Sequence, residues 1–342
     1  MKSKIVLTVA TLTIIVGAVV FGKFVLESRS IDRSGFENNK LKVLSYATFV
    51  SSFGPGPEVA RQFKAKYGVD VELVNVGDSG LLIQKLKEDP SIYADVVLGL
   101  DPLMVMDAQT FLGWKEINEN IYKKIIPEIR KDFESPFVPI TWSPMTFIYR
   151  KSKMKSANSL EEFLKINSTS VVSLQDPRFS TPGLELDYWF FYLNMNLSKL
   201  KGGQFRVSPS WSQSYGLFKR QVAQAVFTYL TSIVFHWEND ADAGKDLDVL
   251  IDKKGHAYQV ELAGVLDRCR RCEDAQKFID FLLEPKIQQL LMKKNYMLPA
   301  VPGVERVGGF EKLPEVKLID YKNSNEFLKA RELRAKQFLE TF

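Results

Sequence analysis

The chain contains very few of the residues that most often bind zinc or act as catalytic nucleophiles. Only two Cys and two His occur among its 342 residues. Neither His lies in a metal-ligand spacing, so the sequence gives little support for a zinc site. No Ser or Cys lies in a recognisable nucleophile motif. Covalent catalysis and zinc chemistry are therefore not the expected activities of this protein.

The chain also lacks a concentrated basic region, an internal repeat and a low-complexity tract. Its formal net charge is only +5, and Lys and Arg are dispersed along the sequence. A nucleic-acid-binding surface requires clustered basic residues, so nucleic acid is not an expected partner. The composition, 45% hydrophobic and 25% charged, is typical of a globular protein, and the length predicts two lobes rather than one core.

A long uncharged run from Ile5 to Gly22 lies near the N-terminus, preceded by Lys2 and Lys4. A basic start followed by an apolar run is typical of an export signal. Because the run is at the short end of what can span a bilayer, a cleaved signal peptide and an uncleaved anchor both remain open. No Cys follows the run, so a lipid-anchored lipoprotein is not expected. We interpret residues 1–40 as signal peptide or anchor plus tether, which predicts a periplasmic location.

Both Cys residues belong to the short segment Cys269-Arg270-Arg271-Cys272. Disulfides form and persist in the oxidising space outside the cytoplasm. The segment follows a predicted strand in a predicted loop, unlike the helix-start position of thioredoxin-like redox motifs. A local disulfide or a pair of unused thiols is the main interpretation, and a redox or metal role is the alternative.

Residues 41–101 alternate between short apolar runs and helical patterns. Such alternation predicts a parallel sheet covered by helices, in which ligands bind beyond the carboxyl ends of the strands. The strands at 137–149 and 256–266 are placed to cross to a second lobe and return. The predicted elements are strands at 41–46, 70–76, 94–100, 137–149, 225–231 and 256–266, and helices at 57–67, 78–86 and 274–293.

Two α/β lobes joined by two crossings describe a hinged clamshell with its ligand in the cleft between the lobes. We expect a first lobe of residues 41–140 with the return segment 257–300. We expect a second lobe of residues 141–256 with C-terminal helices at 301–342.

The segment from Gln175 to Gly183 has the pattern of a strand end, a polar turn and a helix start. Ser180 or Thr181 can cap this helix, and Pro182 can occupy its first turn. A helix start presents free backbone N–H groups and partial positive charge, which suits an anion such as a phosphate. A purely structural helix cap is the alternative.

A family resemblance is carried by several segments taken in order: Val43–Phe49 with Gly54–Pro57, Ala94–Asp101, Gln175–Gly183, Trp211–Phe218, Tyr229–Ser232 and His256–Glu261. Together they resemble the thiamine-binding periplasmic proteins, the substrate-binding components of thiamine ABC transporters. The resemblance covers roughly residues 41–313 and implies the α/β fold of type II periplasmic binding proteins. It also implies a monomer that passes its ligand to the membrane subunits of an ABC importer.

The ligand implied by the resemblance is thiamine (vitamin B1), its monophosphate or its diphosphate, with no cofactor. Thiamine has a flat aminopyrimidine ring and a positively charged thiazolium ring. Flat rings stack on Tyr and Trp, and aromatic faces hold a cation when water is excluded. The resemblance assigns a stacking role to Tyr46 and places Trp211 and Tyr229 along the cleft. The alternative for each ring is a structural role in the core.

The resemblance further assigns polar contacts to Asp78, which would accept a hydrogen bond or balance the cation. It places Ser180 and Thr181 beside the phosphate.

The chain also departs from the family pattern in several places. Ala47 replaces an acidic residue, Phe53 and Tyr296 stand where the family has Trp, and Phe235 replaces a cleft Tyr. Phe53, Phe235 and Tyr296 keep an aromatic ring, so we include them among the ligand-binding residues. The hydroxyl lost at Phe235 leaves open a different heteroaromatic cation, since such contacts discriminate strongly between ligands.

Three other functions remain as alternatives. Ferric-ion binders share the architecture but use paired tyrosines, whereas Tyr229 is followed by Leu230. An enzyme could use the carboxylates expected near the cleft edges for acid–base chemistry. A membrane-tethered sensor would keep the clamshell without feeding a transporter. The carboxylates in question are Asp78, Asp101, Asp176 and Glu261.

Overall fold

The computed structural model describes residues 40–342, except residue 90 and residues 131–135. The predicted signal peptide or anchor lies outside the described residues. Residues 40–342 form one compact unit, and the bounds predicted for two lobes within it remain a prediction. In this part of the chain, no helix is both long and apolar enough to cross a membrane.

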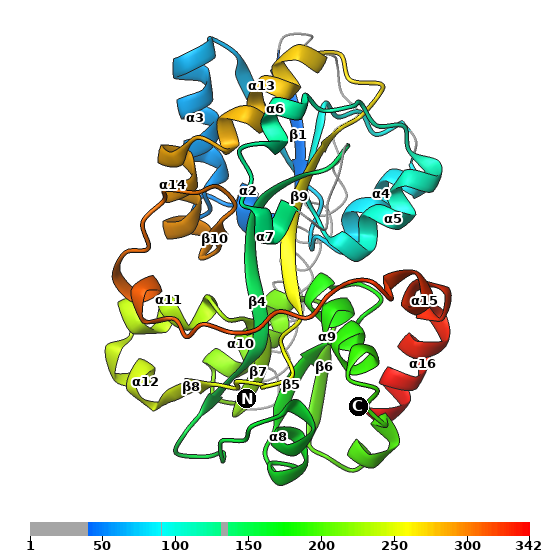
Figure 1. Ribbon diagram of the computed structural model, residues 1–342, viewed down its shortest axis with the longest axis vertical. Coiled ribbons are helices and arrows are strands. Elements are labelled where there is room, and N and C mark those ends of the chain that lie inside the picture. The colour runs from blue at the N-terminus through cyan, green and yellow to red at the C-terminus, as the bar shows by residue number, and fades with distance from the viewer. Residues whose placement is uncertain (1–39, 90, 131–135) are drawn as a thin grey trace, which may run out of the picture. The chain divides into compact units, whose positions relative to one another are not determined.

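The strands form one continuous mixed sheet whose order is β2-β1-β3-β9-β4-β7-β5-β6, with β8 and β10 paired to β4. We call the part containing β1, β2 and β3 the first half-sheet, and the part containing β5, β6 and β7 the second half-sheet. Figure 1 shows β4 and β9 passing from one to the other. The strands are β1 (Lys40–Ser45), β2 (Asp70–Asn75), β3 (Val96–Leu100), β4 (Val138–Arg150), β5 (Val172–Gln175), β6 (Phe205–Ser208), β7 (Ala225–Tyr229), β8 (Leu247–Val249), β9 (Tyr258–Val265) and β10 (Leu298–Pro299).

The parallel pairing predicted for the first strands is confirmed. β1 pairs in parallel with β2 on one side and with β3 on the other. β9 then runs antiparallel to β3 and to β4. In the second half-sheet β5 is parallel to β6 and to β7, and β7 is antiparallel to the end of β4. The carboxyl ends of β1 and β3 therefore lie at one edge, where a ligand site is expected.

Helices cover both half-sheets. α5 and α13 pack against β9, α10 packs against β5, β6 and β7, and α15 and α16 pack against α9. The helices are α2 (Ala47–Val50), α3 (Gly56–Tyr67), α4 (Leu81–Glu88), α5 (Pro102–Phe111), α6 (Glu119–Tyr122), α7 (Pro127–Arg130), α8 (Leu160–Ile166), α9 (Thr181–Tyr192), α10 (Trp211–Lys219), α11 (Ser232–Asn239), α12 (Ala241–Asp246), α13 (Cys272–Leu282), α14 (Pro285–Asn295), α15 (Ser324–Lys329) and α16 (Arg331–Thr341), with short 3-10 helices η1 (Leu197–Leu200) and η2 (Gly308–Lys312).

The single helix predicted at 274–293 is wrong, because the segment forms two helices. α13 ends at Leu282 and α14 begins at Pro285. Proline has no backbone N–H and its ring clashes with the preceding turn, so it is tolerated in the first turn of a helix but not in the interior. Glu284, just before it, has the extended conformation that proline favours in its neighbour.

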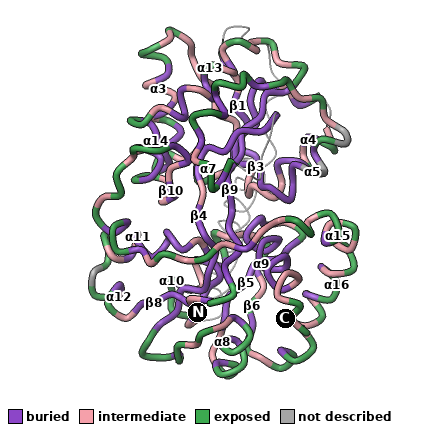
Figure 2. The backbone as a smooth tube through the Cα atoms, in the orientation of Figure 1, coloured by how far each residue is buried: buried purple, intermediate pink, exposed green. Residues whose placement is uncertain are grey.

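The core lies along most of the strands and along α9, which are buried, whereas β2 is only partly covered (Figure 2). β3 and β9 are buried along their whole length. Behind the first half-sheet, Phe63 packs edge-on against Phe278 and Phe281. In the second, Phe147 packs against Phe163 and Phe227. These separate aromatic clusters fix the helices on each half-sheet and leave the edge beyond β1 and β3 free for a site.

The predicted local disulfide is confirmed, since Cys269 and Cys272 are bonded to each other. The loop between them is also held by Asp95, whose Oδ1 accepts hydrogen bonds from the backbone N–H groups of Arg270 and Arg271 at 2.8 and 2.9 Å. Asp95 directly precedes β3, so this loop lies at the end of β3 opposite to the edge where the site is expected.

Candidate functional site

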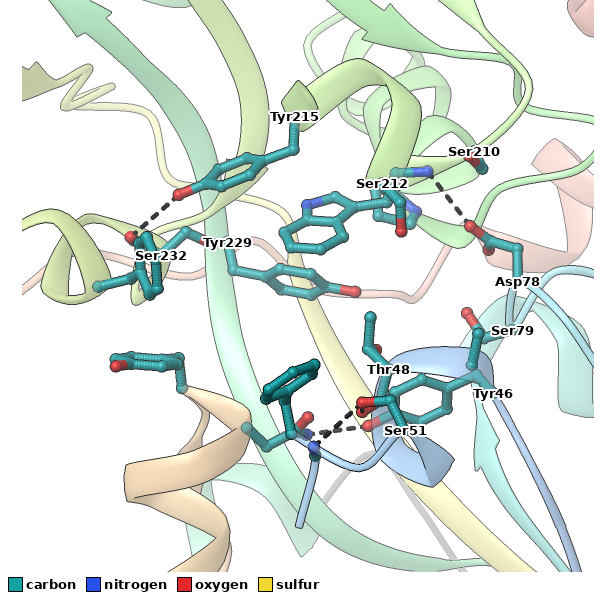
Figure 3. Close-up of a pocket in the computed structure, with 18 of the residues that line it drawn as sticks. Tyr46, Thr48, Ser51, Asp78, Ser79, Ser210, Ser212, Tyr215, Tyr229 and Ser232 are labelled. Atoms are coloured by element: carbon teal, nitrogen blue, oxygen red, sulfur yellow. Dashed lines mark hydrogen bonds between the residues drawn. The ribbon is translucent and has the colours of Figure 1, made fainter. Parts of the chain in front are cut away.

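A cleft of about 950 Å³ lies where the two half-sheets meet. It is lined by the end of β1, the loop before α4, one side of α10, α11 and the end of α14 (Figure 3). Most of the predicted site residues line it: Tyr46, Phe53, Asp78, Trp211, Tyr229, Phe235 and Tyr296. Their roles toward a ligand remain predictions. Ser180 and Thr181 are not among its lining residues, although Pro182 is.

Tyr46 lies at the end of β1, as predicted, and its hydroxyl reaches a buried carboxylate. It donates a 2.5 Å hydrogen bond to Oε1 of Glu261 on β9. Oε2 of Glu261 accepts from Oγ1 of Thr141 at 2.6 Å and from Nδ2 of Asn295 at 3.0 Å. Burial raises the pKa of Tyr46 well above its usual value, so the phenol stays protonated at neutral pH. The ring is therefore held rigidly at the cleft with its hydroxyl turned inward.

The position of this ring depends on Gly99 in β3. Gly99 has a φ of 99°, and a Cβ atom there would lie 2.3 Å from Cδ1 of Tyr46. Only glycine gives both the left-handed backbone and the open space for the ring.

Trp211 forms the opposite wall at the start of α10. Its ring stacks on Tyr215 with a centroid distance of 4.8 Å and an interplanar angle of 20°. Its Nε1 donates a 2.8 Å hydrogen bond to Oγ1 of Thr228, and Tyr229 lies at 6.0 Å in a tilted arrangement. Tyr215 was missed as a site residue, although its position four residues after Trp211 places both rings on one helix face.

A further aromatic group closes another side of the cleft. Tyr296, at the end of α14, has the left-handed φ of 52°, which is rare for a residue with a side chain. Its ring meets that of Phe235 edge-on at 5.6 Å, and its hydroxyl accepts a hydrogen bond from Asn239. Phe53 lines the same cleft but is 90% exposed. Phe53 is thus an exposed apolar ring at the rim of the cleft, where a ligand could pack against it.

Asp78 joins the two half-sheets. Its Oδ2 accepts a 3.2 Å hydrogen bond from the backbone N–H of Trp211, at the start of α10, and its Oδ1 accepts from Gly80. A carboxylate at a helix N-terminus is stabilised by the helix dipole and by free N–H groups. Burial raises the pKa of Asp78, and these hydrogen bonds oppose the rise. Asp78 therefore has a bridging role as well as a place beside the cleft.

The turn at 175–183 packs against the loop that contains Asp78. Oγ1 of Thr181 shares a 2.9 Å hydrogen bond with Oγ of Ser79 and accepts another from Gln259 at 3.1 Å. Ser180 occupies the N-cap position of α9 as predicted, but its side chain makes no capping hydrogen bond. The side chains of this turn thus take part in contacts between the half-sheets.

We expect Gly80→Ala to weaken ligand binding about tenfold, because a side chain at this position would push the loop before α4 away from the turn before α9. A Cβ atom at Gly80 would lie 2.1 Å from the backbone oxygen of Phe179. Alanine suits the start of α4 otherwise, so stability should change little. Titration calorimetry and thermal melting measure both effects, with Gln84→Ala on the exposed side of α4 as control. Unchanged affinity in Gly80→Ala would show that the close contact between Gly80 and Phe179 is not needed for binding.

Within the described residues, no group of three or more His, Cys, Asp or Glu side chains is arranged to hold a metal ion. Tyr229 hydrogen-bonds to Gln259 and is followed by the buried Leu230. The cleft combines aromatic walls with the buried carboxylate of Glu261, and four basic side chains also line it, so it offers stacking faces together with charges of both signs. The basic residues are Lys219, Arg220, Lys293 and Lys294.

Comparison with known proteins shows the family to which this chain belongs. Residues 48–289 match the family described as "Bacterial extracellular solute-binding protein". The "Thiamine-binding periplasmic protein" of Salmonella typhimurium is 33% identical over 289 residues, which cover 81% of this chain and 86% of the relative. That of Haemophilus influenzae is 30% identical, with 77% and 80% covered.

Solved structures agree. A "Periplasmic thiamin binding protein" superimposes with a TM-score of 0.80 at 28% identity and covers 90% of this chain and 98% of its own. The apo ferric ion-binding protein A of Pasteurella haemolytica gives a TM-score of 0.71 at 16% identity, covering 89% of this chain and 98% of its own, which shows a shared fold alone. The predicted fold class is therefore confirmed. The chain belongs to the bacterial extracellular solute-binding protein family and resembles its thiamine-binding periplasmic members.

Proposed function

We propose that this chain is an extracytoplasmic substrate-binding protein that captures thiamine or a thiamine phosphate and delivers it to an ABC importer. The observation that carries the proposal is the cleft itself, with Tyr46 on one side, Trp211 on the other and a buried carboxylate bonded to the hydroxyl of Tyr46. Stacking on aromatic faces suits both rings of thiamine, and the carboxylate suits its charge. The resemblance to periplasmic thiamine-binding proteins supports the same ligand and a periplasmic location.

The proposed mechanism is capture by closure around the ligand. Ligand binds between the half-sheets, its rings stack on the aromatic walls, and closure excludes water. Asp78 and Thr181 already bridge the half-sheets through Trp211 and Ser79, so they would hold the closed form. A ligand shifts an open–closed equilibrium only by binding the closed form more tightly. The closed surface is then what the membrane subunits of the importer would recognise.

In this proposal the chain acts as a monomeric carrier and not as an enzyme, and it needs no cofactor. Its fold is shared with ferric-ion-binding proteins, so the choice between thiamine and iron rests on the residues of the cleft. Neutral aromatic rings dominate the walls, whereas Fe(III) requires several anionic oxygen ligands.

Equilibrium dialysis tests this proposal. Purified protein is dialysed against thiamine and, separately, against ferric citrate, and bound ligand is measured. We expect about one thiamine per chain and no retained iron. Retention of iron without thiamine would replace the proposal with the ferric alternative. Conversion of thiamine to a product would show catalysis.

A further inference from the structure

Glu261 is a buried carboxylate that faces the cleft without a cationic partner. It lies on β9, is 6% exposed and lines the cavity. Its hydrogen-bond donors are the neutral groups of Tyr46, Thr141 and Asn295. Among the residues that the structure describes, no Lys, Arg or His forms an ion pair with it.

Neutral donors favour the ionised carboxylate, but they do not supply the opposite charge that burial requires. Moving a carboxylate from water into a protein interior is costly unless it is paired. Accordingly, burial raises the pKa of Glu261 while its three donors act in the opposite direction. A cation in the cleft would therefore find a fixed, dehydrated acceptor of its charge.

Asp78, the other carboxylate that lines the cleft, is less suited to this task. Its oxygens accept from the backbone N–H groups of Trp211 and Gly80, and the start of α10 already offsets its charge. The three hydrogen bonds to Glu261, in contrast, all come from side chains. The residue best placed to balance a ligand cation is thus not the one that the sequence indicated.

Tyr46 couples Glu261 to the stacking surface. Because its hydroxyl donates to the carboxylate, electron density in the ring rises, and an electron-rich ring attracts a cation more strongly. The ring lines the cleft. Asn295 donates to both Tyr46 and Glu261 and so fixes the pair in one arrangement.

We propose that Glu261 is a specificity-determining residue that makes the cleft select ligands with a fixed positive charge. The inference rests on the proposed function and adds to it the property by which a ligand is chosen. A flat heteroaromatic cation would be selected over a neutral molecule of the same shape, since an uncharged ligand leaves the buried carboxylate unbalanced.

The test compares thiamine with its neutral isostere, in which a carbon atom replaces the positively charged ring nitrogen. Titration calorimetry on wild-type protein should show that thiamine binds about 30-fold more tightly than the isostere. In Glu261→Gln, thiamine should bind about 30-fold more weakly than to wild type, and the isostere should change by less than about threefold. The selectivity for charge would then be lost.

A matched control is Thr141→Val, which removes one donor to Glu261 but keeps the negative charge. Its affinities are expected to fall for both compounds while their ratio is kept. A glutamine at 261 can still accept from Thr141 and bond to Tyr46, and thermal melting checks its folding. Should it fail to fold, the comparison of the two compounds on wild-type protein decides alone.

Equal binding of the two compounds by wild-type protein, or equal losses for both in Glu261→Gln, would overturn this inference and leave the proposed function standing. Failure of wild-type protein to bind either compound would overturn the proposed function and this inference together.

Discussion

Replacing Trp211 with alanine is expected to weaken thiamine binding by about 100-fold while the protein stays folded. The indole forms one wall of the cleft and stacks on Tyr215 behind it. Its loss removes a stacking face and leaves Oγ1 of Thr228 without its indole donor. The backbone N–H that bonds to Asp78 remains, so the bridge between the half-sheets is kept.

Calorimetry on Trp211→Ala, Trp211→Phe and wild-type protein measures this effect. Phenylalanine keeps a stacking ring but loses the hydrogen bond to Thr228, so a smaller loss of about tenfold is expected. Near-unchanged affinity in Trp211→Ala, with a normal melting transition, would contradict the assignment of this wall.

Replacing Asp101 with asparagine is expected to stabilise the protein at alkaline pH. Asp101 follows β3 and caps α5 through a 2.8 Å hydrogen bond from the N–H of Leu103. Its carboxyl faces that of Glu185 on α9, and both are fully buried. Oδ2 of Asp101 and Oε1 of Glu185 have no other hydrogen-bond partner. The two carboxyls can bond to each other only by sharing a proton.

Burial raises the pKa of Asp101 to about 7 and raises that of Glu185 well above its usual value. The unfolded chain releases the Asp101 proton near pH 4, so between about pH 4 and 7 the folded state binds more protons. The free energy of unfolding therefore falls as pH rises through this window. The stability that the Asp101 proton contributes is complete below about pH 4 and is lost as pH rises through about 7, whereas the ionised Asp101 raises the pKa of Glu185 and so favours its protonated form.

Asparagine supplies a permanent donor to Glu185 and keeps an oxygen for the helix cap, which it serves as well as aspartate. We expect Asp101→Asn to be about 2–4 kcal/mol more stable than wild type near pH 8 and about equal near pH 4. Urea unfolding across this range measures the difference, with the exposed Asp242→Asn as control. An identical pH slope in wild type and Asp101→Asn would show that Asp101 takes up no proton on folding in this range.

Local patterns predicted the elements well but not where their side chains meet. The strand at β1, the turn before α9 and the start of α3 follow from short apolar runs, Gly and Pro. Pro285 also indicates the break between α13 and α14, but the helical pattern continues on both sides of it, and a single helix was predicted. The local pattern placed Tyr46 near the end of a strand, but the ligand-binding roles of Tyr46 and Trp211 were expected because of the family resemblance.

Contacts between distant segments could not be predicted. Asp78 meets the start of α10 across 133 positions, and Tyr46 meets Glu261 across 215. Periodic patterns in the sequence do not predict such pairs, because these contacts form only when the half-sheets come together. For the same reason the sequence could not show that the hydroxyl of Thr181 bonds to Ser79 and Gln259, and the role toward a phosphate that the resemblance implies for Thr181 stays a prediction. Glu261 was noted as a carboxylate near the cleft, without its partners.

The central claim is that this cleft binds thiamine or its phosphates. Calorimetric titration of the purified protein with thiamine, thiamine monophosphate and thiamine diphosphate tests it most directly. We expect a dissociation constant of about 1 µM or lower for at least one of the three, with about one ligand per chain. Absence of heat and of any thermal shift with all three would contradict the claim and direct the search to other heteroaromatic cations.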